Sequence, residues 1–212
     1  MTALETIFAW LIAILSALGL LLSFRVTSGK RRKQFFVYYT NLSNLAMLLV
    51  HGRLLIPGRC RALLRTPPAR YLAAMCILVT FVIYFFVLTR FGRYAGQDTM
   101  RSLGVRRISN ALVHYVVPLL CQLEWLTAAD KSGLGIRDAA LWLLVPLAYF
   151  AFLLLRAQTG VIIENAGSLW PYGFMDRETL GVRKWARNIL GTLALFFLLG
   201  LIGVGIAALD FI

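Results

Sequence analysis

The sequence has few acidic residues and lacks the short motifs that identify common enzyme classes. It contains 9 Asp and Glu beside 22 Lys and Arg. There is no G-x-S-x-G elbow, no H-E-x-x-H, no Walker A loop and no G-x-G-x-x-G. Carboxylates are also missing from the middle of the apolar runs, which argues against a proton-coupled transporter.

Cysteine is scarce, and its spacing is not that of a disulfide or metal site. Cys60, Cys76 and Cys121 are odd in number, far apart and form no C-x-x-C pair. We interpret them as ordinary small apolar residues. The sequence therefore predicts no disulfide framework and no metal site, and we expect no cofactor.

Apolar residues make up 60% of the chain, and the mean hydropathy is +0.77. Apolar runs of about 18 or more residues recur, and each matches a hydrocarbon core of about 30 Å at 1.5 Å per residue. We predict an all-α polytopic membrane protein whose single domain, residues 1–212, is a bundle of six transmembrane helices. The predicted spans are residues 4–24, 35–56, 71–89, 108–127, 138–158 and 188–212.

The net charge of +13 lies mainly in the connections between these runs. Fifteen Lys and Arg lie in or beside the first, third and fifth connections, and seven in or beside the second and fourth. The positive-inside rule then places the odd connections in the cytoplasm and both termini outside, although the arginines of the second connection favour the opposite orientation. We expect these charges to contact anionic lipid headgroups, and we expect no nucleic-acid partner.

The second span carries a cluster of polar side chains in the segment FFVYYTNLSNLAM, residues 35–47. Thr40, Ser43, Asn44 and His51 follow helical spacing and share one stripe. Polar groups at membrane depth usually face the bundle interior, which makes them candidate site residues. The alternative is that they only join neighbouring helices.

The fourth span carries a second polar stripe, Asn110, His114 and Pro118, spaced by four residues. Because Pro118 has no N–H, the carbonyl of His114 loses its helical donor, and we expect a kink there. Glu124 lies about 15 Å further along this span and on another face, so we expect it near the outer end.

Depth predicts which of these side chains meet. Thr40 lies five residues and His114 six residues past the starts of their spans, so both lie about 8–9 Å below the same interface. His51 lies about 16 Å further along its helix. The sequence therefore predicts that Thr40 and His114 meet, and that the two histidines do not share one haem.

A Thr–His pair suits nucleophilic catalysis. A Thr hydroxyl is a poor nucleophile until a base removes its proton, and neutral His is suited to that role. Such a pair can attack an acyl carbonyl and form an acyl-enzyme that water then hydrolyses. Polar support, as oxyanion donors or by orienting the imidazole, is expected from Asn41, Ser43, Asn44 and Asn110.

The longest connection, residues 159–187, contains the segment WPYGFMD. Gly and Pro interrupt it too often for a span, and its aromatic residues suit the headgroup region. We predict an interfacial segment on the cytoplasmic face. Its residues Trp170, Tyr172 and Phe174 either cover the site as a lid or anchor the segment in the interface.

Three motifs occur in order: YYTNLSN in the second span, HYVVPLL followed by Glu124 in the fourth, and WPYGFMD before the last. This set resembles the androgen-induced protein / androgen-dependent TFPI-regulating protein family of membrane threonine hydrolases, over nearly the whole chain. The resemblance implies cleavage of fatty acid esters of hydroxy fatty acids by one Thr and one His, which correspond to Thr40 and His114. The basic connections and compact length are more similar to a bacterial member, which implies a multi-pass protein of the bacterial inner membrane with access to other lipid esters.

The sequence therefore predicts an intramembrane lipid ester hydrolase with Thr40 as nucleophile and His114 as general base. Its expected partners are membrane lipids and a lipid ester that enters from the bilayer. Two alternatives remain: a non-catalytic membrane protein that binds a lipid or transports a small solute, and a protein that has this fold without the activity.

Overall fold

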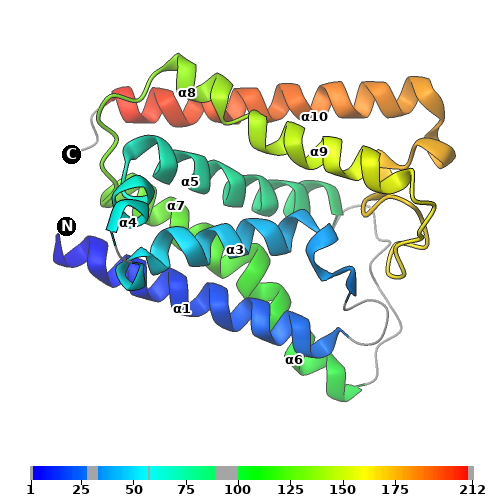
Figure 1. Cartoon of the computed structure of the whole chain (residues 1–212), viewed down its shortest axis with the longest axis horizontal. Helices are drawn as coiled ribbons and strands as arrows, with labels where there is room; N and C mark the ends of the chain where they lie inside the picture. Colours follow the sequence, from blue (N-terminus) through cyan, green and yellow to red (C-terminus); the bar gives the residue numbers. More distant parts are fainter. Residues whose placement is uncertain (1, 28–32, 57, 89–99, 210–212) are drawn as a thin grey trace.

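The computed structural model describes residues 2–27, 33–56, 58–88 and 100–209. Within these residues the elements are all helical, apart from an isolated bridge between Ile163 and Ser168. The elements (Figure 1) are α1 (Ala3–Val26), η1 (Phe35–Val37), α3 (Tyr39–His51), η2 (Gly52–Leu55), α4 (Gly58–Leu64), α5 (Pro67–Val82), η3 (Ile83–Leu88), α6 (Met100–Ala111), η4 (Leu112–Val116), α7 (Val117–Thr127), α8 (Ile136–Leu141), α9 (Leu144–Ala157), η5 (Gly173–Met175) and α10 (Arg177–Ala208). Of these, η3 and η4 are π-helical and the other three short η elements are 3₁₀.

Four helices in the described part of the chain are long and apolar enough to cross a membrane. They are Ala3–Val26, Pro67–Leu88, Ile136–Ala157 and Arg177–Ala208, which correspond to the first, third, fifth and sixth predicted spans. The all-α prediction is confirmed, together with these four apolar helices.

The second and fourth predicted spans are not among those four, the second because its helix is short and the fourth because its polar residues lower its hydropathy. The second is divided into η1, the 13-residue α3 and η2, and α3 alone covers only about 20 Å. The fourth is helical throughout, but it begins at Met100 and contains the π-turn η4. The polar side chains that make these segments chemically interesting also lower their hydropathy.

Other predicted boundaries differ from the structure. The fifth span is divided at residues 142–143 into α8 and α9. The sixth helix begins at Arg177 rather than at residue 188, with a non-helical break at Gly181, whose φ of 72° lies in the left-handed region. The added first turns carry basic residues, which a helix accommodates readily outside the hydrocarbon core. Residue 89 and residues 210–212, which end two predicted spans, lie outside the described residues.

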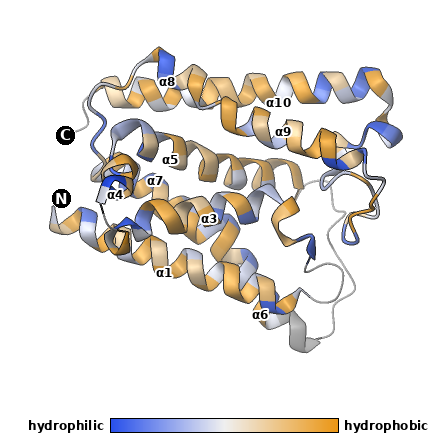
Figure 2. Cartoon of the chain, viewed as in Figure 1, coloured by the Kyte–Doolittle hydropathy of each residue, from blue (hydrophilic) through white to orange (hydrophobic). Residues whose placement is uncertain are grey.

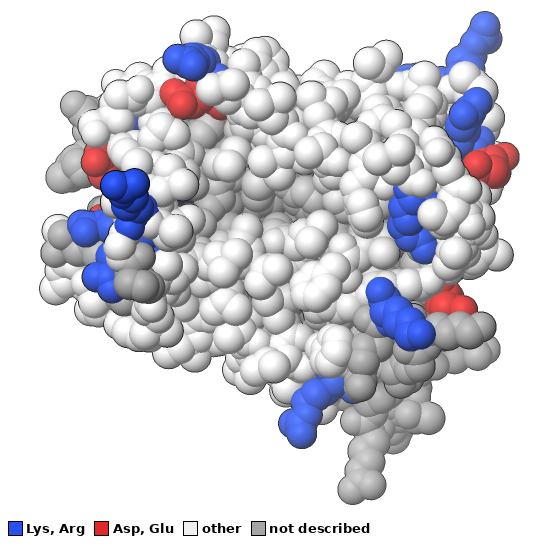
Figure 3. Space-filling view, viewed as in Figure 1, with Lys and Arg blue, Asp and Glu red and all other residues white. Residues whose placement is uncertain are grey.

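The helices lie side by side, and both ends of the bundle are polar (Figures 1 and 2). Figure 1 shows both termini, α4 and α8 at one end, and the loop between α9 and α10 at the other. Hydrophilic residues concentrate at these two ends, and Lys and Arg leave a broad uncharged belt between them (Figures 2 and 3). Large apolar side chains on the outer surface of α1, including Ile7, Ile14 and Leu21, are more than half exposed. Such a belt suits contact with lipid.

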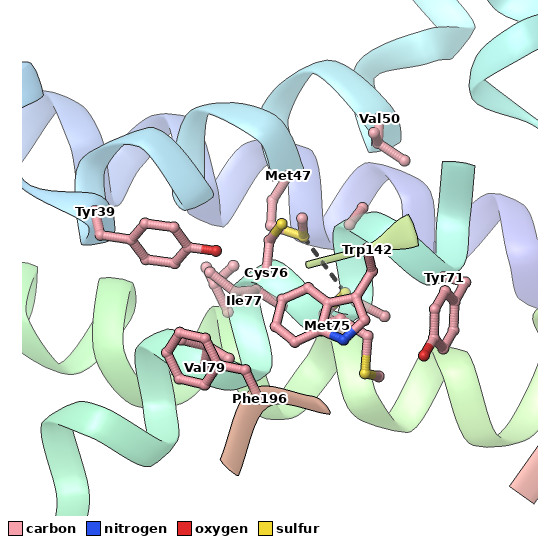
Figure 4. Packing of buried hydrophobic residues seen from close by; sticks show 14 of the residues in the cluster. Tyr39, Met47, Val50, Tyr71, Met75, Cys76, Ile77, Val79, Trp142 and Phe196 are labelled. Carbon is pink, nitrogen blue, oxygen red and sulfur yellow. Dashed lines mark hydrogen bonds between the residues drawn. The ribbon is translucent and has the colours of Figure 1, made fainter. Parts of the chain in front are cut away.

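The core lies where α3, α5, α7, α9 and α10 meet. Met47, Met75 and Ile77 are almost completely buried there (Figure 4). Close approach of α1 to η4 depends on Gly19, because a Cβ at this position would lie 2.9 Å from Val113 Cγ1. This contact packs α1 directly behind the segment that carries His114.

A buried ionic network lies at the end of the bundle that holds the termini. Arg70 donates to Glu5 Oε1 at 2.8 Å and to Glu124 Oε1, and His51 Nε2 lies 3.8 Å from Glu124 Oε2. Arg53 is buried nearby and donates to a backbone carbonyl at 2.8 Å. Glu124 lies near the outer end of its span, as the sequence predicts. It is buried, however, and paired with Arg70, which the sequence places in a loop.

Candidate active site

The structure brings Thr40 and His114 together. Thr40 Oγ1 on α3 lies 3.2 Å from His114 Nε2 on η4, and both side chains are partly buried. The two residues are 74 positions apart in sequence. This is the contact that equal depth on the second and fourth spans predicts. His51 lies at the opposite end of α3 beside Glu124, away from this pair.

The imidazole of His114 is held with its basic nitrogen towards the threonine. His114 Nδ1 lies 3.2 Å from the carbonyl oxygen of Asn110, one helical turn earlier. A carbonyl only accepts, so Nδ1 carries the hydrogen, and in a neutral ring Nε2 then has the lone pair. Thr40 donates its hydroxyl hydrogen to that lone pair, which is the geometry of a nucleophile and its general base.

Tyr84 and Asn110 fix the plane of the imidazole ring. Tyr84 on η3 stacks on His114 with ring centroids 3.8 Å apart and an interplanar angle of 26°. The side chain of Asn110 donates to the hydroxyl of Tyr84. The sequence predicts that Asn110 orients His114. In the structure the backbone carbonyl of Asn110 contacts the imidazole directly, and its side chain acts indirectly by binding Tyr84, which stacks on the ring.

The helix around His114 and Pro118 has a π-helical hydrogen-bond register, whereas the prediction assumed an α-helical one. Val117 N–H bonds to Leu112 O, five residues back, which makes η4 a π-turn. In this register the donor to the carbonyl of Val113, and not that of His114, would be the N–H that Pro118 lacks. A buried carbonyl without a donor is costly, so another group must supply one.

Asn44 supplies that donor. Its Nδ2 lies 3.0 Å from Val113 O and 2.8 Å from Thr40 O, and its side chain is completely buried. Both amide hydrogens are used in these two contacts, which leaves none for an oxyanion. Asn44 therefore joins the backbone of Thr40 to the residue next to His114, and it sets the separation of the pair.

Ser43 and Asn41 occupy different positions around Thr40. Ser43 Oγ lies 2.7 Å from Thr80 Oγ1 and points to α5, so it joins helices and does not face His114. Asn41 lines the same cavity as His114 and donates one amide hydrogen to Phe35 O at 2.6 Å. Its second amide hydrogen has no partner among the described residues, which leaves it available to an oxyanion.

The start of α3 adds a second donor beside the nucleophile. Thr40 is the second residue of this helix, where a backbone N–H has no carbonyl partner within the helix. The N–H of the first residue, Tyr39, donates to Tyr172 Oη at 3.1 Å. The N–H of Thr40 and the positive end of the helix dipole therefore lie at the nucleophile itself.

Two cavities meet at Thr40. The first, which we name the apolar slot, lies between α5, η3, α9 and α10 and contains about 630 Å³ of empty space, its open mouth included. The second, the polar chamber, contains about 1350 Å³ on the same basis and is lined by Asn41, Arg106, Arg107, Asn110 and His114 among others. Thr40, Tyr84, Leu88 and Tyr172 line both. The nucleophile thus lies where an apolar and a polar space join.

The WPYGFMD segment is folded into the bundle over these cavities. Tyr172 lines both cavities and Phe174 lines the apolar slot, with their rings stacked at a centroid distance of 5.6 Å. Trp170 is buried but lines neither; its Nε1 donates to Glu178 Oε2 at 2.6 Å. A lid function for Tyr172 and Phe174 stays a prediction, whereas Trp170 holds the segment to α10.

Asp176 caps α10 and closes the segment, and its ionisation should make the segment sensitive to pH. It accepts from Ser168 Oγ, Thr179 Oγ1 and Thr179 N–H at 2.9 to 3.1 Å. Partial burial acts to raise the pKa of Asp176, but these hydrogen bonds outweigh it and the pKa lies below its ordinary value. The stabilisation is therefore present above the ordinary Asp pKa and is lost as the pH falls through the lower, folded-state pKa.

We accordingly expect Asp176→Asn to destabilise the segment by about 0.3–1 kcal/mol at neutral pH, because the amide can still accept hydrogen bonds at the cap but lacks the negative charge that the helix N-terminus favours. Limited proteolysis within residues 159–176 should increase in the variant at pH 7 and change less than in the wild type as the pH falls. Asp130→Asn, in an exposed loop at the other end of the bundle, is the control. Equal cleavage of Asp176→Asn and wild type at pH 7 would show that the cap does not hold the segment.

Several residues of this arrangement were not predicted. Tyr84 lies in an aromatic run that reads as lipid-facing surface, and Tyr39 is an ordinary apolar-span residue in the sequence. The only sequence signal was Pro118, which showed that a nearby carbonyl needs a new donor. No family model matches the chain, and comparison with curated proteins and with solved structures likewise found no match.

Proposed function

We propose that the protein is an intramembrane hydrolase of lipid esters that uses Thr40 as nucleophile and His114 as general base. The observation that carries the proposal is the 3.2 Å contact from Thr40 Oγ1 to His114 Nε2, with Nδ1 on the Asn110 carbonyl. A contact that only joined helices would not need the imidazole fixed on its other nitrogen and on its face. The position of the pair between two cavities gives an ester room on both sides.

The reaction follows from these positions. Thr40 Oγ1 attacks the ester carbonyl carbon as its proton passes to His114 Nε2, and the carbonyl oxygen becomes an oxyanion near the N–H of Thr40 and the amide of Asn41. Collapse breaks the ester bond, and the alcohol leaves with the proton from His114. Water then attacks the acyl-Thr40, giving up a proton to His114, which returns it to Thr40 as the free acid leaves.

The membrane arrangement supports this assignment. We propose that α3 and the α6–α7 segment complete a six-helix bundle with the four long apolar helices, and that their polar residues are sheltered inside it. Arg53 and Arg70 are buried in the ionic network, so only five of the seven basic residues that opposed our orientation remain, against fifteen. The active site then lies near the cytoplasmic interface of, we propose, the bacterial inner membrane.

The substrate class rests on the resemblance to the androgen-induced protein family of membrane threonine hydrolases. It suggests fatty acid esters of hydroxy fatty acids or related lipid esters. Both residues that the resemblance assigns, Thr40 and His114, are the two that lie in contact. The competing class is a membrane protein that only binds a lipid in these cavities or moves a small solute.

Covalent labelling separates these classes. A fluorophosphonate probe should label wild-type protein in detergent, because only an activated hydroxyl reacts with it, and mass spectrometry should locate the adduct on Thr40. Labelling should be lost in Thr40→Ala and strongly reduced in His114→Ala. Thr80→Ala retains Thr40 and is the control for a buried threonine on a neighbouring helix. Labelling that persists without His114, or at another residue, would contradict the proposed pair.

A further inference from the structure

The apolar slot runs along α10, from the lid segment towards the middle of the bundle. Its lining residues on this helix include Ile189, Leu193 and Phe196, which lie on one face at helical spacing. The start of this face is next to the lid segment, since Asn188 Nδ2 donates to Phe174 O at 3.2 Å. Phe196 therefore lies about 10 Å deeper than Ile189, towards the middle of the bundle.

The deep end of the slot is closed by a rigid aromatic pair. Phe196 is 7% exposed, and its ring centroid lies 5.8 Å from that of Trp142, which is 1% exposed. Trp142 is fixed against α10 at Gly200, where a Cβ would lie 2.8 Å from Trp142 Cδ1. Val79 on α5 lines the same slot. The end wall cannot recede without displacing the packing of two helices.

Most of the hydroxyl groups along the slot are used within the protein, whereas the buried Tyr39 Oη has no hydrogen-bond partner among the described residues. Thr80 bonds to Ser43, Tyr149 donates to Val37 O, and Thr192 donates to Asn188 O. Among the residues that the structure describes, no Lys, Arg, Asp or Glu lines the slot, whereas the polar chamber has two arginines at its wall. A hydrocarbon chain is the ligand that such an apolar space accepts best, and a polar or anionic group would favour the chamber.

We infer that the acyl chain of the ester lies in the apolar slot, with its length limited by Phe196, and that the alcohol part lies in the polar chamber. This inference rests on the proposed function and adds the orientation of the substrate and the residue that sets chain-length preference. The acyl group transferred to Thr40 is then the one in the slot.

The test is hydrolysis of p-nitrophenyl esters of saturated acids of increasing length. Phe196→Ala should move the maximum of kcat/KM to longer chains, with a gain on the order of tenfold for an acid two methylenes longer, since each buried methylene is worth about fourfold. Leu193→Phe, which narrows the slot nearer its mouth, should move the maximum to shorter chains. Phe197→Ala is the matched control, because Phe197 is 36% exposed and outside the slot.

A second measurement separates failure of the inference from failure of the proposed function. In Thr40→Ala, saturated fatty acids should displace the fluorescent fatty acid cis-parinaric acid, with a length preference that Phe196→Ala shifts to longer chains. That shift without hydrolysis by any variant would support the slot and contradict the hydrolase. An unchanged length preference in both Phe196→Ala and Leu193→Phe, or an equal shift in Phe197→Ala, would overturn the inference.

Discussion

Thr40→Ala and His114→Ala should each lower kcat for ester hydrolysis by a factor of about 10² or more, which is the contribution expected of a general base and the nucleophile it activates. Thr40→Ser should retain a measurable part of the rate, because it preserves the hydroxyl that faces His114 Nε2. The double variant should be little slower than either single variant, since neither residue contributes without the other. KM should change less than kcat, because the two cavities stay intact.

The measurement is steady-state hydrolysis of a fatty acid ester of a hydroxy fatty acid by purified protein in detergent. Thr159→Ala, in the loop after α9, is the matched threonine control, and thermal unfolding of every variant verifies the fold. Activity that survives either Thr40→Ala or His114→Ala would refute the mechanism. Losses that multiply in the double variant would show that the two residues act independently.

Asn44 positions the Thr40–His114 pair without taking part in the proposed reaction. It touches neither an expected substrate atom nor His114, yet it joins Thr40 O to Val113 O. Its loss should therefore change the separation of the pair while both reacting groups remain present. This is why a polar residue beside a nucleophile is better assigned from its hydrogen-bond partners than from its position in the sequence.

The Thr40–His114 contact was predictable because it depends on few assumptions. Two helices that start at the same interface place residues of equal offset at equal depth, which is the basis of the prediction. The contact is present although the offsets from the observed helix starts differ, because α3 begins at Tyr39 and the helix of His114 begins at Met100. The supporting contacts were not predictable, because they depend on the π register that moves the missing donor from His114 to Val113. A one-residue change in register determines which carbonyl Asn44 must satisfy.

Three charged residues that the sequence places at the ends of spans or in a loop are buried in the structure. Hydropathy places Arg53 near the edge of a span and Arg70 at the end of a loop, and it treats Glu124 as an outer residue. In the folded chain these residues are at most 5% exposed, because they come from different helices and partly neutralise one another. Pairing between distant helices cannot be inferred from a single span. The sequence therefore places these charges at the correct end of the bundle, but it predicts them to be exposed when they are buried.

Removal of Glu124 should be the most destabilising single change outside the site. Glu124→Gln leaves Arg70 with Glu5 as its remaining carboxylate and leaves His51 without its acidic neighbour. Breaking a buried ion pair from one side typically costs about 3–5 kcal/mol, because the other charge stays buried. Replacing both partners, in Arg70→Met with Glu124→Leu, should cost less than the sum of the single changes, since no unpaired charge remains between them. The free energy of unfolding in mixed micelles, from a denaturant series, measures each value.

The location of the network makes this prediction specific to stability. His51 lies eleven residues after Thr40 on α3, about 16 Å along the helix, so folded Glu124→Gln should retain the wild-type kcat below its unfolding temperature. Glu164→Gln, an exposed acid at the opposite end of the bundle, is the control and should change stability by less than about 0.5 kcal/mol. A Glu124→Gln protein as stable as this control would mean that water already satisfies Arg70. A stable protein with lost activity would instead mean that the network acts on the site through α3, which the separate hydrogen bonds of His51 and Thr40 argue against.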